Sequence, residues 1–362
     1  MNFAFGEEDE AIREAARSLL DKISTSETWH KAADAGKGQE DRLWKELAEN
    51  GWLGAVVPGD LGGSELSYTS LCVLAEEMGY ALAPVPFSSS VYLVTEAVLA
   101  FGSPEQKKSY LPDLASGKSV GALAVAEKGV MHPSACTLSV KNGKLQGSKW
   151  PVADGMPASL ALVLAKDGAG LSLFLAPLKE ARKTALPSLD PTRSLARIDF
   201  DGVAAERLGE AGKGAELLER LWDRAGVLFA YEALGGASRC LHMGTEYAKA
   251  RYAFGRPIGS FQAIKHRLAD MFAKTELARS NCYYGAWALS KDVPELRGAS
   301  GLSQWIAQDA FVFGAQENVQ IHGGIGFTWE ADPHLFTKRA KFIEHGCGGR
   351  REWGERVLAV IQ

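Results

Sequence analysis

Residues 251–271 read RYAFGRPIGSFQAIKHRLADM, and this stretch separates long helical patterns. Before it, apolar residues recur at helical spacing from Ala215 onward, beginning with Leu217, Leu218 and Leu221. After it, residues 262–289 and 302–320 each predict a further long helix. Long helices joined by short connections usually lie antiparallel in a bundle. The stretch therefore predicts a C-terminal α-helical bundle over residues 215–362.

The rest of the chain divides into two regions with different patterns of apolar and polar residues. Residues 1–118 follow a helical pattern that is interrupted at Pro58-Gly59 and at residues 84–86 and 102–104. Residues 119–214 alternate between apolar and polar positions, with turn signals at Asn142-Gly143 and Asp167-Gly168. The sequence thus predicts an α+β protein with an N-terminal α-helical domain (1–118), a middle β-barrel-like or β-sandwich domain (119–214) and a C-terminal four-helix-bundle domain (215–362).

Composition limits the classes of partner. The chain has 362 residues, of which 46% are hydrophobic, and a formal net charge of −4. This charge gives no reason to expect nucleic acid or an anionic membrane as a partner, because both attract clustered Lys and Arg. The five cysteines stand singly, with no CxxC and no metal-like grouping, which favours buried thiols in a reducing cytoplasm. We find neither a secretory signal pattern at the start nor an apolar run long enough for a membrane span.

Four stretches together resemble the acyl-CoA dehydrogenase family: residues 251–271, QIHGGIGFTWE (320–330), GWLGAVVPGDLGG (51–63) and GSPEQKKSYLPDLASGK (102–118). The likeness covers essentially the whole chain in order and agrees with the α-β-α layout. It implies FAD bound at a subunit interface, an acyl-CoA thioester as substrate and an electron-transferring flavoprotein as the acceptor. No GxGxxG or GxxxxGK[ST] pattern suggests a competing nucleotide-binding fold.

The resemblance also implies which residues contact FAD. The positions that would reach a neighbouring subunit's FAD are Arg251, Phe254, Ile258, Phe261, Gln262, Gln320, Gly323 and Gly324. A guanidinium offers forked donors to a pyrophosphate, an aromatic ring packs on a flat heterocycle, and paired glycines allow close backbone approach. The alternative is structural: a helix-terminal cation, a core aromatic residue and a helix C-cap. Their occurrence together at the family spacing favours FAD contact.

The proton-abstracting carboxylate of the family is missing from this sequence. Alignment without gaps places Cys347 where most members carry a glutamate, and Gly349 where a threonine usually follows. Some relatives place the base on the preceding long helix, and that position is Ala225 here. An unperturbed thiol has a pKa of about 8.5 and is a poor proton acceptor at neutral pH. We therefore interpret Cys347 as a residue that fills an emptied base position.

Two other carboxylates are candidate bases. Glu232 lies two helical turns beyond Ala225, about 10 Å along the same helix face. This distance is too long for a small acyl chain but suits a larger or differently placed substrate. Glu344 precedes Cys347 by three residues and could enter the site if the loop register differs. The structural alternative for Glu344 is a solvated or ion-paired carboxylate.

The flavin-ring contacts of the middle domain also depart from the family pattern. Where the family often reads T-E-P-G-x-G-S-D, this chain has AEKGVMHP over residues 126–133, without the hydroxyls at its ends. Where the family has W-x-T, this chain has Pro151, Val152 and Ala153. Backbone N–H groups at Val125, Ala126 and Glu127 remain as candidate contacts to the cofactor.

The departures from the family pattern affect only part of the site. The residues that would contact a neighbour's FAD are present, whereas the catalytic base and the side chains that would contact this chain's own flavin ring are missing. The sequence thus favours a subunit of an FAD-dependent acyl-CoA dehydrogenase that forms a Cα=Cβ bond, in an unlike-subunit tetramer whose partner supplies the base. One alternative is a self-sufficient homo-oligomeric dehydrogenase with a displaced base. The other is a non-catalytic homologue that binds acyl-CoA or a protein partner.

Overall fold

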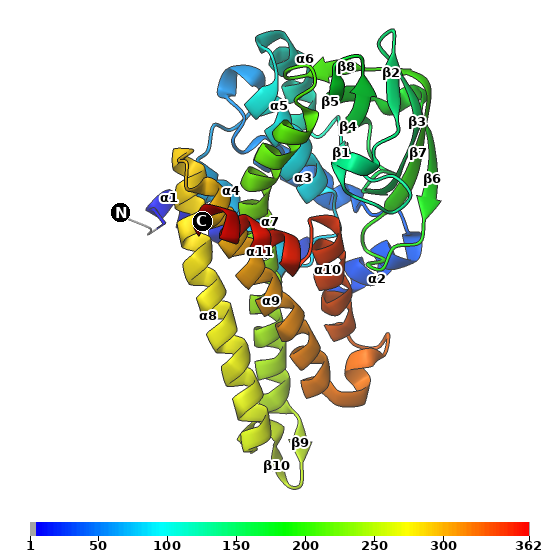
Figure 1. Ribbon diagram of the computed structural model, residues 1–362. Coiled ribbons are helices and arrows are strands. Elements are labelled where there is room, and N and C mark those ends of the chain that lie inside the picture. Colours follow the sequence, from blue (N-terminus) through cyan, green and yellow to red (C-terminus); the bar gives the residue numbers. More distant parts are fainter. Residues whose placement is uncertain (1–4, 362) are drawn as a thin grey trace. The chain divides into compact units, whose positions relative to one another are not determined.

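The computed structural model describes residues 5–361 and consists of two compact units. Unit 1 comprises Met1–Ser26, Tyr68–Ala83 and Gly226–Gln362, and unit 2 comprises Glu27–Ser67 and Pro84–Ala225. Each unit is therefore built from segments that are distant in the sequence (Figure 1). The long helix α7 (Gly214–Ala250) contributes residues to both units.

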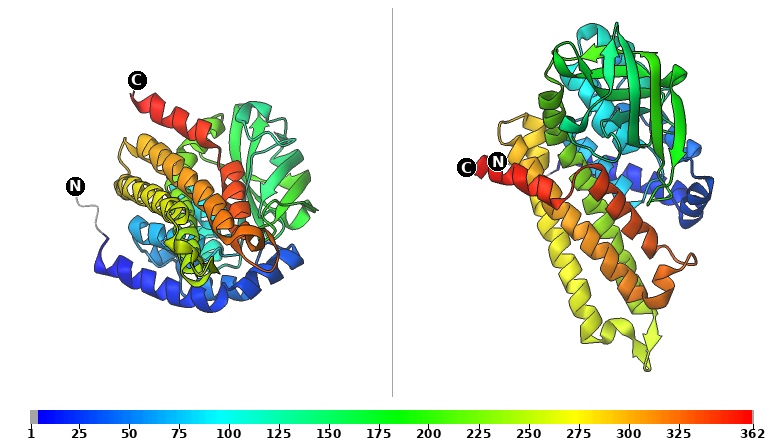
Figure 2. Two further views of the ribbon diagram at one scale, coloured as in Figure 1. Left: turned by 90° about the horizontal axis from the view of Figure 1, so that it is seen from below. Right: turned by 45° about the vertical axis from the view of Figure 1, so that its right-hand side comes forward.

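Unit 1 is helical. Besides its share of α7 it contains α1 (Glu7–Ile23), α4 (Tyr68–Tyr80), α8 (Gln262–Lys291), α9 (Leu296–His322), α10 (Pro333–Gly346) and α11 (Arg350–Ile361). The long helices α8 and α9 run side by side in both views of Figure 2, and the predicted bundle is confirmed. Helix α1 begins with four acidic residues, and the Gly6 N–H donates to Asp9 Oδ2 at 3.0 Å. Negative charge there stabilises the helix N-terminus.

Helices α4 and α7 touch through their backbones. A Cβ built at Gly79 would overlap the Glu232 carbonyl oxygen, and a Cβ at Gly235 would overlap the Glu76 carbonyl oxygen. Any larger residue at either glycine would push the two helices apart. The contact brings the carboxylates of α4 against α7 inside the unit.

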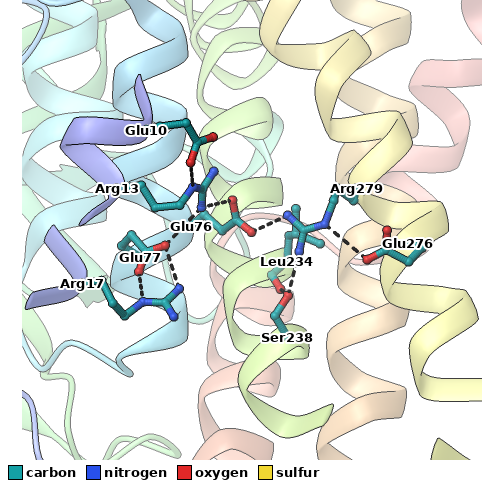
Figure 3. Close-up of polar contacts among 9 residues, drawn as sticks. All are labelled: Glu10, Arg13, Arg17, Glu76, Glu77, Leu234, Ser238, Glu276 and Arg279. Carbon is teal, nitrogen blue, oxygen red and sulfur yellow. Dashed lines mark hydrogen bonds and ion pairs between the residues drawn. The ribbon is translucent and has the colours of Figure 1, made fainter. Parts of the chain in front are cut away.

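Figure 3 shows how the two buried carboxylates of α4 are neutralised. Glu77, fully buried, accepts hydrogen bonds from Arg13 Nη1 at 3.1 Å and Arg17 Nη2 at 2.8 Å. Glu76 accepts from Arg13 Nη1 at 2.8 Å and from Arg279 Nη1 at 2.6 Å. Arginines from α1 and α8 thus flank the same pair of acids, so this cluster joins three helices of unit 1.

Removal of the Glu77 charge tests the contribution of this cluster. We expect Glu77→Gln to lower the free energy of unfolding by about 2–3 kcal/mol, less than for a fully buried pair because both arginines reach solvent. Chemical denaturation measures the change. Glu10→Gln is the matched control, because Glu10 is mostly exposed and lies 3.5 Å from Arg13, and we expect less than about 0.5 kcal/mol there. Equal losses in the two variants would contradict the assignment.

Unit 2 combines helices with one sheet. Its helical elements are α2 (Ser26–Ala35), which begins at the last residue of unit 1, α3 (Asp41–Glu49), η3 (Ser88–Thr95), α5 (Glu96–Phe101) and α6 (Pro104–Ala115), with 3-10 turns η1 (Trp52–Gly54), η2 (Gly59–Leu61), η4 (Pro133–Ala135) and η5 (Leu178–Glu180). Its strands are β1 (Gly121–Ala124), β2 (Ser139–Lys141), β3 (Lys144–Ala153), β4 (Leu160–Asp167), β5 (Gly170–Pro177), β6 (Arg182–Leu186), β7 (Leu195–Ala204) and β8 (Glu206–Leu208).

These strands form a single eight-stranded mixed sheet in the order β6-β7-β3-β2-β4-β5-β8, with β1 parallel to β4. The hairpins predicted at Asn142-Gly143 and Asp167-Gly168 are present as β2–β3 and β4–β5. Asn142 and Gly143 both have positive φ, as a two-residue hairpin turn requires. One face of the sheet buries an apolar core that includes Leu145, Val163 and Phe174. The predicted fold class is confirmed.

The structure also agrees with two expectations drawn from composition. All five cysteines are unpaired and buried, as expected for thiols that act as small apolar side chains. Over residues 5–361, no helix has both the length and the apolar character needed to cross a bilayer.

Candidate functional site

Two turns of unit 1 lie toward the same end of the helix bundle (Figure 1, Figure 2). The first joins α7 to α8 and contains the short hairpin β9 (Tyr252–Ala253) and β10 (Arg256–Pro257), followed by η6 (Ile258–Ser260). The second is η7 (Gly323–Phe327), which follows α9. Tyr247 of α7 and His322 of α9 stack with ring centroids 4.1 Å apart and so hold the two helix ends together.

The residues of unit 1 predicted to contact FAD lie on these two turns or at the adjoining ends of α8 and α9. Arg251, Gln262, Gln320, Gly323 and Gly324 are exposed, and Ile258 and Phe261 are half-buried. Phe254 is 95% exposed, so the alternative that it is a core residue is wrong. Within residues 5–361, no carboxylate lies within ion-pair distance of Arg251. An unpaired guanidinium beside an outward-facing aromatic ring suits a dianionic pyrophosphate and a flat heterocycle.

Gly323 ends α9 with a φ of 66°, so the C-cap interpretation also holds for it. A Cβ built at Gly323 or Gly324 would meet no atom within 4 Å. The backbone of this turn is therefore open, and a ligand can approach it closely. The exposed guanidinium, the exposed ring and this open turn together fit FAD. FAD, when bound, supplies the hydride acceptor.

Cys347 follows α10 and is buried. Its thiol donates to the Ile343 carbonyl oxygen at 3.0 Å, and Gln304 Nε2 donates to Cys347 Sγ at 3.0 Å. Burial raises the pKa of the Cys347 thiol far above its usual range, the Gln304 hydrogen bond lowers it only in part, and the charges of Glu232 and Glu344 raise it further. The thiol is therefore protonated at neutral pH and cannot act as a base.

The two candidate carboxylates differ in their surroundings. Glu232 on α7 is buried, and its Oε1 lies 3.7 Å from Arg339 Nη1. Arg339 is also buried and donates through Nη2 to the Ala83 carbonyl oxygen at 3.3 Å. Glu344 is partly exposed and accepts a hydrogen bond from Lys341 Nζ at 2.6 Å, one turn away on α10. Both carboxylates are thus held by cations, and the α7 position Ala225 is a buried methyl group.

In unit 2, the segment 126–133 is anchored by a buried ion pair. Lys149 of β3 is fully buried and donates to Glu127 Oε1 at 2.7 Å and to the Val125 carbonyl oxygen at 3.1 Å. Val125 and Ala126 are themselves buried, and the Trp150 N–H donates to the Ala126 carbonyl oxygen at 2.9 Å. The Glu127 N–H donates to the Val130 carbonyl oxygen at 3.1 Å, so it is not free for a cofactor.

Glu127 provides a pH test of this anchor. Burial opposes ionisation, but hydrogen bonds from Lys149, Thr137 and the Leu138 and Thr137 N–H groups lower the pKa of Glu127 to about 2. A folded-state pKa below the unfolded value of about 4.3 means that ionised Glu127 stabilises the fold above about pH 4.3 and loses this effect as the pH falls through about 2. We expect Glu127→Gln to lower the thermal unfolding midpoint at pH 7, with a difference from wild type that shrinks toward pH 2.

Calorimetry between pH 2 and pH 7 measures this difference. The matched control is Glu180→Gln, because Glu180 is an exposed glutamate of the same unit. A midpoint difference for Glu127→Gln that stays constant across the pH range would contradict the anchoring role.

Sequence reasoning missed three residues around these sites: Lys149, Gln304 and Gln308. The signals are visible in retrospect. Buried and exposed residues roughly alternate along β3, and Lys149 lies on the same buried side of this strand as Leu145. Gln304 and Gln308 lie four residues apart on the buried face of a helix, where only a satisfied polar group is expected.

Comparison with known proteins gives a consistent result. Residues 6–118 match the family model "Acyl-CoA dehydrogenase, N-terminal domain", and residues 212–353 match "Acyl-CoA dehydrogenase, C-terminal domain". The chain is 32% identical over 358 residues to the acyl-CoA dehydrogenase IpdE2 of Mycobacterium tuberculosis, covering 98% of this chain and 96% of the relative.

Two solved structures are similar over nearly the whole chain. The ChsE4–ChsE5 complex from Mycobacterium tuberculosis matches with a TM-score of 0.90 at 26% identity, covering 100% of this chain and 99% of the other. A Tcur3481–Tcur3483 steroid ACAD variant matches with a TM-score of 0.89 at 28% identity, covering 98% of each chain.

The helical units, the mixed sheet and the outward-facing turns define a flavin-dependent oxidoreductase. More particularly, the chain belongs to the acyl-CoA dehydrogenase family, whose members act on CH–CH groups of acyl-CoA thioesters with FAD as cofactor.

Proposed function

We propose that this chain is one subunit of an unlike-subunit acyl-CoA dehydrogenase, in which it completes an FAD site whose catalytic base belongs to the partner. The observation that carries the proposal is the state of position 347. A buried, protonated thiol held by Gln304 occupies the base position, while the turns that would face a neighbour's FAD are exposed and open.

The chain's own residues then have a binding role. Arg251 would donate to the pyrophosphate, Phe254 would pack on a ring of the cofactor, and the open Gly323–Gly324 backbone would approach it. Ile258 and Phe261 lie on the first turn, Gln262 begins α8 and Gln320 lies in the last turn of α9, and all four would complete this surface. In unit 2, the ion pair between Lys149 and Glu127 would hold the backbone at Val125 and Ala126 in place.

Two relatives support the assembly. One similar structure is a ChsE4–ChsE5 complex and the other a Tcur3481–Tcur3483 steroid ACAD, and each name joins two differently named components. A ring-bearing acyl-CoA is thus the substrate class that we propose to test first, with an electron-transferring flavoprotein as the acceptor.

Reconstitution with Arg251 variants tests the proposal. We expect the chain alone to lack stoichiometric FAD and dye-linked turnover, and to acquire both when co-purified with an unlike homologous subunit.

Arg251→Gln should weaken FAD binding by roughly tenfold or more, because a charge-assisted hydrogen bond to the pyrophosphate is lost. Flavin absorbance and FAD titration measure both effects.

The matched control is Arg351→Gln, because Arg351 is an exposed arginine of the same unit, far along the chain from both turns, and should leave FAD binding unchanged. Full FAD content and turnover of the lone chain would overturn the unlike-pair proposal in favour of a self-sufficient enzyme. Absence of flavin under every pairing would instead favour a non-catalytic homologue that binds acyl-CoA or a protein.

The candidate bases are tested separately in the active assembly. Rapid-reaction measurements follow flavin bleaching by substrate in Glu232→Gln and Glu344→Gln. We expect rates within about twofold of wild type for both, because Glu232 is paired with Arg339 and Glu344 with Lys341. A general base would instead contribute roughly 10²–10⁴-fold. A loss of that size in either variant would identify the base in this chain.

A further inference from the structure

The buried face of α9 is unusually polar near position 347. Ser300, Gln304 and Gln308 follow one another at intervals of four residues, so their side chains project from the same face of the helix. All three are fully or almost fully buried, with exposures of 0%, 0% and 1%. Buried polar side chains in such a row need hydrogen-bond partners.

The nitrogen atoms of the two amides have partners on the loop after α10. Gln304 Nε2 donates to Cys347 Sγ, and Gln308 Nε2 donates to the Gly348 carbonyl oxygen at 3.3 Å. The same carbonyl oxygen accepts from Trp353 Nε1 at 3.0 Å. These contacts attach the loop of residues 347–349 to α9.

The oxygen atoms of the same side chains lack partners. Over residues 5–361, no protein donor lies within hydrogen-bond distance of Ser300 Oγ, Gln304 Oε1 or Gln308 Oε1. Exchange of the amide atoms does not solve this problem. A reversed Gln308 would place two acceptors, its own oxygen and that of Gly348, against each other. A reversed Gln304 could accept from the Cys347 thiol, but its nitrogen would then lose its acceptor.

The wall opposite this face is formed by α7. A Cβ built at Gly226 would overlap both Ser300 Oγ and the ring of Trp353, so α7 approaches α9 closely at this point. Gly226 directly follows Ala225, the second position where the family places a base. The polar face of α9 therefore lies beside Cys347 at one point and beside the neighbour of Ala225 at another.

We propose that α9 and the loop of residues 347–349 hold ordered water between them. Water is the donor that fits, because the two amide oxygens can only accept hydrogen bonds and the Ser300 hydroxyl can accept one as well as donate. The water molecules donate to Ser300 Oγ, Gln304 Oε1 and Gln308 Oε1. Water bound to these side chains would lie next to Cys347, so the surroundings of that residue would be polar and not only apolar. The water site itself does not depend on the proposed function; only the interpretation of Cys347 as an emptied base position does.

A crystal structure of the assembled protein tests the site directly. We expect ordered water within hydrogen-bond distance of at least two of the three oxygens, and loss of that density in Gln308→Met. Side chains rearranged so that protein groups satisfy all three oxygens, with no water between α9 and the loop, would overturn the proposal.

The sign of a stability change gives an independent test in solution. If Ser300 Oγ binds water, Ser300→Ala removes a satisfied hydroxyl and should lower the thermal unfolding midpoint by roughly 1–2 °C. If Ser300 Oγ has no partner, the same substitution removes an unsatisfied atom and raises the midpoint, which would contradict the proposal. Ser280→Ala is the matched control, because Ser280 is an exposed serine within helix α8 and should change little. Neither readout depends on FAD or turnover, so failure here leaves the proposed function standing.

Discussion

The backbone contact between α4 and α7 at Gly79 and Gly235 constrains the interior of unit 1 more than any other interaction described. Helices at this separation leave no room for side chains between them, so the residues beside the glycines must find partners to either side. Glu76 and Glu77 turn toward Arg13, Arg17 and Arg279, and the carboxylate of Glu232 lies beside Arg339. The close contact at two glycines is thereby accompanied by a set of arginines from three other helices, which neutralise the buried carboxylates.

The same helices organise the functional regions of unit 1. At one end of the bundle, α7, α8 and α9 finish in turns whose polar and aromatic groups point outward. Further along α9, the face that meets Cys347 is polar and closed. The outward surface proposed to bind a cofactor and the inward position proposed to lack a base belong to one set of helices. The geometry is therefore compatible with division of one reaction between two different chains.

The sequence predicted the long helices, the hairpin turns and the family from local patterns, because helical periodicity and turn residues act over a few positions. It also predicts that Cys347 and Ala225 occupy emptied base positions, which stays a prediction. It could not predict that Glu232 lies beside Arg339 or that Gln304 lies beside Cys347. These pairs are separated by long stretches of chain, and their contacts depend on how α7, α9 and α10 cross. The buried pair of Lys149 and Glu127 was missed for the same reason: the alternation of β3 indicates an inward lysine, but not which acid it meets.

The burial of every cysteine has a practical consequence for spectroscopy. Because Cys72, Cys136, Cys240, Cys282 and Cys347 are all inaccessible in the folded chain, a thiol introduced on the surface would be the one that a maleimide dye or nitroxide label reaches first. A labelled position on the β9–β10 hairpin could then report, by energy transfer or dipolar distance, when another polypeptide assembles against that end of the bundle. No removal of native cysteines would be needed, so the packing around position 347 would stay intact during such a measurement.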